Sequence, residues 1–248
     1  MMPTAIMMQT TTHGWTVIDK DAGVLSYTYT WDAKTHSTAN TFTARLKNGD
    51  LVVINPANVD EDAMFADLAQ FGNVGAVVAP NGFHHLGQPI WRKRFPNARY
   101  FAPSKAVPRI AKKNPAAGAF EPLSALLPLL ADGVNIVEAA QSKCGECWAW
   151  APIAGGNAWF ASDVLANMPH LPKNPIIRFM FKASKSAPGY KVFGLATKFI
   201  LGDRKPALRT ILDQVRAHPP TVMVPGHGGL LSGASLANDT VALIQSAL

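Results

Sequence analysis

The sequence predicts an α/β protein in which two β-sheets lie face to face between two layers of helices, a four-layer αββα sandwich. Two β-rich blocks, at residues 15–54 and 134–161, are each followed by segments in which apolar residues have helical spacing. The chain has 248 residues, of which 48% are hydrophobic, and this is enough for one large core. We therefore expect a single domain over residues 1–248.

The first block contains four predicted strands, at residues 15–18, 25–30, 41–46 and 51–54, in which β-forming side chains alternate or cluster. Asn48-Gly49 separates the last two strands and is a hairpin signal. Helical spacing over residues 61–71 and an apolar run at 74–79 then predict a strand, helix and strand crossover. After it we expect a helix at 90–95, a strand at 99–101 and a helix that Ser104 opens.

The second half begins with residues 115–130, for which no regular structure is predicted. Three short strands follow at 134–137, 147–151 and 158–161, with a turn at 155–157. Residues 205–217 predict a helix, 221–224 a strand, and Ser235 is the expected cap of a final helix that ends at Leu248. The apolar, basic and proline-interrupted segment at about 169–203 reads as an insertion or lid.

Charge is concentrated in that part of the chain. The net charge is +7, and ten Lys or Arg residues stand against two Asp residues between positions 170 and 216. Such an excess suits a solvated basic face, an anionic ligand, a nucleic acid or an acidic membrane surface. No nucleic-acid-binding motif accompanies it, so we expect no nucleic-acid partner.

The remaining composition points to a cytoplasmic protein. Residues 1–14 lack the basic and apolar regions of a secretory signal, and no apolar run is long enough for a membrane span. The only cysteines, Cys144 and Cys147, do not make a disulfide scaffold, and their CxxC spacing precedes a strand rather than the helix of a redox motif. The oligomeric state stays open.

Histidines provide the strongest functional signal. His84, His85 and His227 stand in Gly- and Pro-containing loops after apolar strands, and Asp163 ends another such strand. Adjacent histidines in a loop can approach one ion, whereas on a strand they would point to opposite faces. Three imidazoles and a carboxylate suit one divalent metal ion, with zinc as the first choice and iron(II) or manganese as alternatives.

The order of these motifs resembles the metallo-β-lactamase superfamily. The resemblance spans roughly residues 15–230 and rests on Asn40, the segment 48–56, the segment 77–86, the segment 160–163 and the segment 224–228. It implies an αββα sandwich with a metal site at the edge between the two sheets. The family's His-x-His-x-Asp-His loop falls on residues 80–85, so its first two histidines are missing and His84 replaces its aspartate.

The resemblance also implies that one of two metal positions has lost its ligands. The loop that supplies the family's next histidine falls near residues 141–146, which contain no histidine. The other position retains His84, His85 and His227, with Asp163 at the family's bridging acid. We therefore expect a mononuclear site.

Further candidates surround this site. Asp163 and Glu146 are the candidate catalytic carboxylates, and Glu146 is alternatively an additional ligand or an exposed turn residue. Possible second-layer hydrogen-bonding residues are Asn55, Asn81 and Ser142. The first places to look for recognition of an anionic group are Arg178, Lys182 and Lys185, while Phe179, Met180 and Phe181 could cover a substrate or pack against the body.

The predicted function is metal-dependent hydrolysis of a small ester, lactone, amide or phosphoester. The alternative is a non-catalytic protein that keeps the fold for binding a ligand or partner, which the loss of three ligands favours. Metal-dependent redox chemistry is a third reading, because three histidines and a carboxylate also suit iron.

Overall fold

The computed structural model describes residues 8–32 and 37–248, so the first half of the 1–14 segment lies outside it. The first sheet consists of eight strands in chain order: β1 (Gln9–Thr10), β2 (Trp15–Asp19), β3 (Val24–Asp32), β4 (Ser37–Arg45), β5 (Leu51–Ile54), β6 (Val74–Val78), β7 (Arg99–Ala102) and β8 (Glu121–Pro122). Neighbours from β1 to β5 are antiparallel, and those from β5 to β8 are parallel. The direction changes at β5 because α1 (Asp62–Ala69) carries the chain back before β6, as the crossover pattern predicted.

The second sheet has five strands in the order β16-β14-β11-β10-β9. They are β9 (Asn135–Glu138), β10 (Cys147–Ile153), β11 (Gly156–Phe160), β14 (Pro220–Val224) and β16 (Leu231–Ser232). A third, three-stranded sheet joins β13 (Gly189–Val192), β12 (Leu165–Met168) and β15 (His227–Gly228). It adjoins the second sheet because β12 and β15 follow β11 and β14 along the chain.

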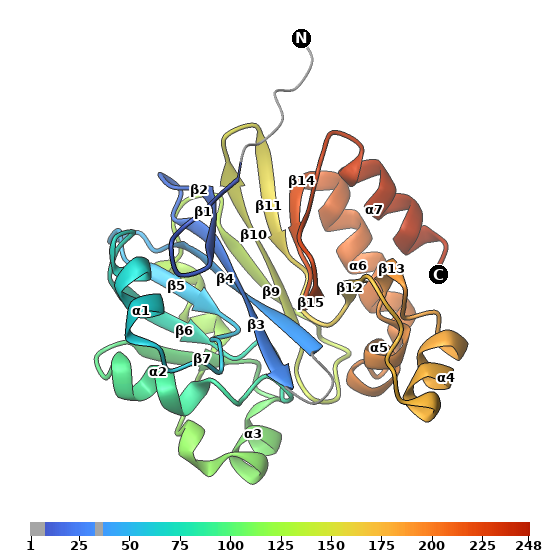
Figure 1. The fold of residues 1–248 in the computed structure, drawn as a ribbon, viewed down its shortest axis with the longest axis horizontal. Helices are drawn as coiled ribbons and strands as arrows, with labels where there is room; N and C mark the ends of the chain where they lie inside the picture. The colour runs from blue at the N-terminus through green and yellow to red at the C-terminus, as the bar shows by residue number, and fades with distance from the viewer. Residues whose placement is uncertain (1–7, 33–36) are drawn as a thin grey trace.

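Four layers result, as Figure 1 shows, with α1 and α2 (Gln88–Arg94) outside the first sheet and α6 (Arg204–Ala217) and α7 (Leu236–Gln245) outside the second. The central core lies between the sheets, where Phe42 of β4 stacks on Phe160 of β11 with ring centroids 6.1 Å apart. Along β10, Ala149 faces this core while Trp148 and Trp150 pack with the α6 side. The predicted αββα sandwich is confirmed.

Most predicted elements appear within a few residues of their expected bounds, but two caps differ. Ser104 does not open a helix, because residues 103–106 form a separate turn and α3 (Val107–Lys113) begins after Ala106. Ser235 occupies the N-cap of α7, yet its hydroxyl donates to Asp239 Oδ2 at 2.8 Å instead of accepting from the helix, which ends at Gln245 rather than Leu248. Residues 115–130 contain β8 and short 3-10 turns at Pro115–Ala117, Leu123–Ala125 and Leu127–Leu129.

The 169–203 segment contains α4 (Pro175–Ala183), β13 and α5 (Gly194–Ile200). It is tied into the molecule, because β13 pairs with β12 and Gly202 N–H donates to the Gln141 carbonyl at 2.6 Å. In contrast, α4 has no buried residue and exposes Ile176 and Phe179. Of the residues that could have covered a substrate, Phe179 and Met180 are exposed, whereas Phe181 packs near Phe193. None of the helices in residues 8–32 and 37–248 has the length and apolarity that crossing a bilayer requires.

Candidate metal centre

His84 lies in the loop that leaves β6, and Asn81 shapes this loop. Asn81 Oδ1 accepts a hydrogen bond from the Phe83 N–H at 2.8 Å, and its backbone oxygen accepts one from the His84 N–H at 3.3 Å. Gly82 allows a close approach, because a Cβ there would lie 3.0 Å from the Cys144 carbonyl oxygen. The chain therefore turns tightly and presents His84 at the end of the first sheet.

Asp163 and His227 are presented by two further strand exits. Ser162 follows β11 with a left-handed φ of 47°, so the chain turns sharply before Asp163. Gly226 packs on that turn, where a Cβ would lie 2.3 Å from the Ser162 carbonyl oxygen. His227 comes directly after this glycine and begins β15. Asp163 and His227 are thus held side by side by backbone contact.

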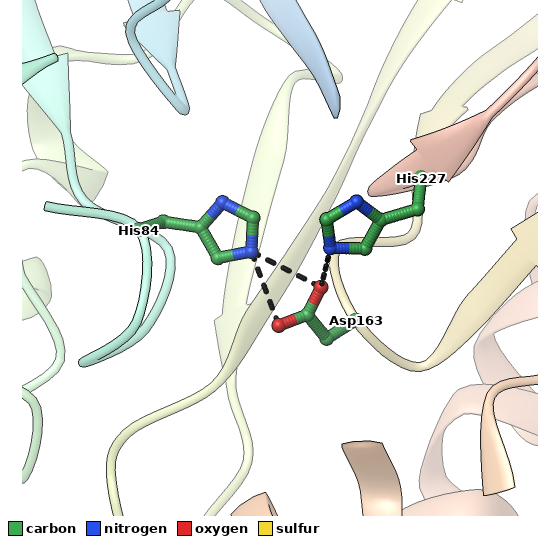
Figure 2. A group of neighbouring side chains, drawn as sticks. All are labelled: His84, Asp163 and His227. Atoms are coloured by element: carbon green, nitrogen blue, oxygen red, sulfur yellow. Dashed lines mark hydrogen bonds and ion pairs between the residues drawn. The ribbon is translucent and has the colours of Figure 1, made fainter. Parts of the chain in front are cut away.

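The three side chains converge, as Figure 2 shows. His84 Nε2 lies 3.0 Å from Asp163 Oδ1 and 3.1 Å from Oδ2, and His227 Nε2 lies 3.1 Å from Oδ1. One ligand atom from each residue lies within 4.8 Å of the others. Asp163 is 5% exposed, so water screens this group of charges poorly.

Outer hydrogen bonds determine which imidazole nitrogen carries the proton. His227 Nδ1 donates to the Thr38 carbonyl at 2.8 Å, and a carbonyl can only accept. His84 Nδ1 lies 2.8 Å from Asn55 Oδ1, and this oxygen is the acceptor because Asn55 Nδ2 donates to the Asn40 carbonyl at 2.9 Å. In each neutral imidazole, Nε2 then carries no proton, and its lone pair faces the Asp163 carboxylate.

Lone pairs that face a carboxylate at 3 Å repel it unless a cation stands between them. The cation can be a proton on each ring or one metal ion that all three residues share. Histidines that bind metals usually donate their other N–H to a carbonyl or carboxyl group in this way. Two imidazoles and a carboxylate also match the donor preferences of zinc, iron(II) and manganese. The residues present therefore fit a divalent metal ion.

The electrostatics of the cluster agree with this. Burial alone would raise the pKa of Asp163, but the charge of His84 and the hydrogen bonds from both histidines hold that pKa well below its ordinary value. Burial alone would lower the pKa of His227, and the hydrogen bond and charge of Asp163 raise it instead. The carboxylate is ionised near neutral pH, and it attracts positive charge.

A cavity of about 550 Å³ opens over the cluster, with His84, His85, Asp163 and His227 among its lining residues. A second cavity of about 380 Å³ shares His227, Trp31 and Phe193 with the first. The larger volume is typical of small-molecule sites. The cluster is therefore accessible to a ligand.

Solved structures of similar shape identify the fold. DIM-1 metallo-β-lactamase superposes with a TM-score of 0.57 at 11% identity, over 99% of each chain. FIM-1 from Pseudomonas aeruginosa, a metallo-β-lactamase in a mono-zinc form, gives a TM-score of 0.51 at 12% identity over 100% of this chain and 98% of its own.

The chain has the metallo-β-lactamase fold.

This fold also occurs as part of a longer chain, the flavodiiron protein from Giardia intestinalis, with a TM-score of 0.55 at 13% identity over 90% of this chain and 57% of that one. No family model matches the sequence, and no curated protein matches it either. The predicted resemblance is therefore confirmed at the level of the metallo-β-lactamase fold.

His85, the fourth predicted ligand, lies outside the group of three. It lines the cavity, and its backbone oxygen accepts from Asn114 Nδ2 at 2.9 Å. Its Nδ1 is buried with no hydrogen-bond partner in the described parts of the chain. Burial, and then the charge of Arg109, lowers the pKa of His85. The structure thus separates the two adjacent histidines.

Of the three residues predicted to support the site by hydrogen bonds, two contact the cluster and one does not. Asn55 contacts His84, as described above, and Asn81 Nδ2 donates to Asp163 Oδ2 at 2.9 Å. Ser142 instead donates to the Ile200 carbonyl at 3.1 Å, so it holds the end of α5.

Glu146 is buried and does not belong to the group of three. Its Oε2 accepts from Asn81 Nδ2 at 3.0 Å, so one amide joins Glu146 to Asp163. Burial, and then the charge of Asp163, raises the pKa of Glu146 well above its ordinary value. Glu146 is therefore a buried acid behind the cluster, and the reading as an exposed turn carboxylate was wrong.

The predicted anion-binding residues Arg178, Lys182 and Lys185 are exposed and line neither cavity near the cluster. Arg178 and Lys182 lie on α4, and Lys185 follows it. Lys173, by contrast, lines the smaller cavity.

Two features of the site are not apparent in the sequence. The Thr38 carbonyl, which accepts from His227, is a backbone atom and carries no residue-type signal. The walls of the large cavity come from segments far apart in the chain, including Trp31 of β3 and Phe199 of α5.

Proposed function

We propose that this chain is a metal-dependent hydrolase with one catalytic ion, held by His84, Asp163 and His227. The observation that carries this proposal is the direction of the imidazoles. Both Nδ1 atoms have oxygen acceptors, so both Nε2 atoms direct their lone pairs toward the Asp163 carboxylate, where an ion can bind between them. Three protein ligands with positions left open are typical of catalytic zinc sites rather than structural ones.

A single ion is proposed because a second one would lack ligands. Among the described residues, this cluster is the group in which three such side chains converge. Pro80, Asn81 and Gly82 offer no imidazole, and Asn81 is occupied by its bonds to Asp163 and Glu146.

The chemistry that a bound divalent ion supplies is Lewis acidity, which activates water near neutral pH and polarises a carbonyl or phosphoryl oxygen. The protein's part is orientation. Asn55 and the Thr38 carbonyl fix the two rings, while Asn81 fixes the carboxylate of Asp163. Asp163 is ionised, so it can also accept a hydrogen bond from a water molecule that enters from the cavity. Glu146 acts on this arrangement through Asn81 and is assigned a positioning role.

The fold supports the class of reaction, and the proposed substrates are a small ester, lactone, amide or phosphoester. The alternative function is non-catalytic ligand binding in the same cavity. Iron-dependent redox chemistry is a further outcome of the metal test, since two histidines and one carboxylate are also a donor set for iron(II).

The test is hydrolysis by protein that has been stripped of metal and reloaded with zinc, manganese or iron(II). The assay uses p-nitrophenyl acetate, a γ-lactone, an anilide and bis(p-nitrophenyl) phosphate, with oxygen consumption recorded for the iron form. We expect turnover of at least one substrate by a loaded form, and its loss in the stripped protein and in His227→Ala. His13→Ala is the matched control, because His13 is exposed and lies outside the cluster. Turnover that does not depend on metal would contradict the proposal, and bound metal without any turnover would favour the binding protein.

A further inference from the structure

The larger cavity is apolar on every side except the one that the cluster forms. Four of its fourteen lining residues are the three histidines and Asp163, and the other ten are aliphatic or aromatic. Among the described residues, no Lys or Arg lines it. A charged group in this space away from the cluster would therefore lose its hydration without gaining a partner of opposite charge.

One wall consists of Trp31 from β3 together with Phe83 and Leu86 from the His84 loop. These three side chains are 42%, 40% and 43% exposed. Single exposed apolar side chains are ordinary on protein surfaces. Here they converge on one cavity beside a group of ionisable residues, and that combination marks a binding site.

The opposite wall is α5, which presents Leu195, Ala196, Phe199 and Ile200 to the cavity. Hydrogen bonds hold this helix at both ends. At its start the Leu195 N–H donates to Ser186 Oγ at 2.9 Å, and at its end the Lys143 N–H donates to the Ile200 carbonyl at 2.7 Å. The wall is thus anchored to the body of the protein, so a ligand meets a preformed surface.

We propose that this cavity selects neutral carbonyl compounds that carry an alkyl or aryl group, with the carbonyl at the cluster and the apolar group between Trp31 and α5. The proposal rests on the proposed function for the reacting group, but the selection itself can be measured as binding without turnover. It replaces the expectation of an anionic substrate, since Arg178, Lys182 and Lys185 do not reach the cavity.

Lys173 is the group that could reverse this selection. It lines the smaller cavity, which shares Trp31, Phe193 and His227 with the larger one. A ligand that extends past His227 could place an anion beside Lys173. The test therefore includes a ligand that carries a carboxylate at its far end.

The first measurement is calorimetric binding of 2-hexanone, 2-octanone and 2-decanone to the metal-loaded protein. The comparison of 2-octanone with 7-oxooctanoate is made in the metal-free protein, because a bound ion would itself ligate the carboxylate. These ketones are inert to hydrolysis. We expect each methylene to tighten binding by up to about fourfold until the space is filled, and 2-octanone to bind at least about tenfold more tightly than 7-oxooctanoate.

Two aspartate variants locate the binding site. Phe199→Asp should weaken 2-decanone binding by about tenfold or more. Phe179→Asp is the matched control and should leave it unchanged, because Phe179 is 72% exposed on α4 and lines neither cavity, whereas Phe199 is 57% exposed and lines the larger one. Both positions are exposed, so both variants should fold, and an unchanged thermal midpoint and metal content will verify this.

The second measurement is hydrolysis of p-nitrophenyl esters of increasing chain length. If ketone binding follows chain length and Phe199 while no ester is hydrolysed, the selection stands and the hydrolase function fails. If esters are hydrolysed but 7-oxooctanoate binds as well as 2-octanone, or chain length has no effect, the selection is overturned and the hydrolase function stands. Failure of both ketone binding and hydrolysis overturns both.

Discussion

At the residue scale, Asn55 is the side chain that connects His84 to the rest of the molecule. Its Oδ1 accepts from His84 Nδ1 at 2.8 Å and its Nδ2 donates to the Asn40 carbonyl at 2.9 Å. Its φ of 57° is left-handed, a conformation that asparagine adopts more readily than most residues. Such backbone conformations persist where surrounding contacts hold them, and they are frequent at functional sites.

Replacing Asn55 tests this connection. Asn55→Gly keeps a residue that accepts the left-handed backbone and removes the side chain, together with its bonds to His84 and to the Asn40 carbonyl. Ligating histidines that lose such a partner typically lose about 10- to 100-fold in metal affinity. We expect a loss of that size for zinc, measured by competition with a chromophoric chelator. Asn48→Gly, in the exposed turn before Gly49, should bind zinc as the parent does. A change below about twofold in Asn55→Gly would contradict the orienting role.

Glu146 gives a pH-dependent prediction for the metal-free protein. Burial and the nearby Asp163 charge raise the pKa of Glu146 in the folded state, so the folded protein binds a proton at Glu146 more tightly than the unfolded chain does. The protonated Glu146 therefore stabilises the folded protein. Its contribution is complete below the pKa of Glu146 in the unfolded chain, about 4.3, and is lost as the pH rises toward the pKa in the folded protein. Glu146→Gln should remove this loss, which is at most about 1.4 kcal/mol per pH unit for one proton. Urea unfolding from pH 5 to pH 8 checks it: parallel curves for parent and variant would show that Glu146 does not hold the proton.

The positions of the cluster residues could be predicted because each stands at the exit of an apolar strand, which is a local pattern. What separates His84 from His85 is not local: His84 is oriented by Asn55 and faces Asp163, and these residues lie 29 and 79 positions away. The burial of Glu146 depends in the same way on packing against Asn81, 65 positions earlier. Those contacts form only in the folded chain and leave no local pattern in the sequence.

At the element scale, Asn40 links β4 to the loop that presents His227. Its Nδ2 donates to the carbonyls of Pro225 and Gly228, both at 2.8 Å, and its backbone N–H donates to the Gly226 carbonyl at 3.2 Å. These bonds join the first sheet to the exit of β14. Asn40 therefore contributes to holding the two halves of the cluster in register.

Asn40→Ala should leave two buried carbonyls without their donor. A buried group that loses its partner costs roughly 1–3 kcal/mol, so we expect the free energy of unfolding of the metal-free protein to fall by about 2–4 kcal/mol. Asn157→Ala is the matched control, because its amide donates to the Pro219 carbonyl at 3.3 Å near the surface. That variant should lie within about 0.5 kcal/mol of the parent. Equal unfolding free energies for the two variants would argue against the linking role of Asn40.

The internal structure of the 169–203 segment could not be predicted from the sequence. Its prolines and basic residues suggested an insertion or lid, but not its internal division. Phe193 and α5 line the cavity, whereas α4 stands away from it. That division follows from β13 pairing with β12, a contact between distant four-residue strands, and short strands carry little periodicity to read.

At the scale of the whole molecule, the layer order could be predicted because both β-rich blocks and the helices after them are long and periodic. The three-stranded sheet could not, since β15 has two residues and pairs only across long separations. The strands whose ends present the cluster residues, β6, β11 and β14, belong to the two main sheets, which pack against each other at a shared interface. Its central contact is the stack of Phe42 on Phe160.

Truncation at this interface should therefore affect the whole molecule. Phe160 is fully buried, and Phe→Ala changes in such cores cost about 3–5 kcal/mol. We expect Phe160→Ala to lose this much in urea unfolding and to lower the thermal midpoint. Phe179→Ala on exposed α4 makes the same chemical change and should stay within about 0.5 kcal/mol of the parent. A similar loss in both variants would mean that the sheet interface is not the main core.

The most direct test of the central claim, one metal centre at His84, Asp163 and His227, is metal content per chain by plasma mass spectrometry on tag-free protein. The parent and His85→Ala should each carry about one equivalent of zinc, iron or manganese, and His227→Ala should carry almost none. Two equivalents in the parent, no metal after incubation with each ion, or loss of the metal in His85→Ala but not in His227→Ala would contradict it.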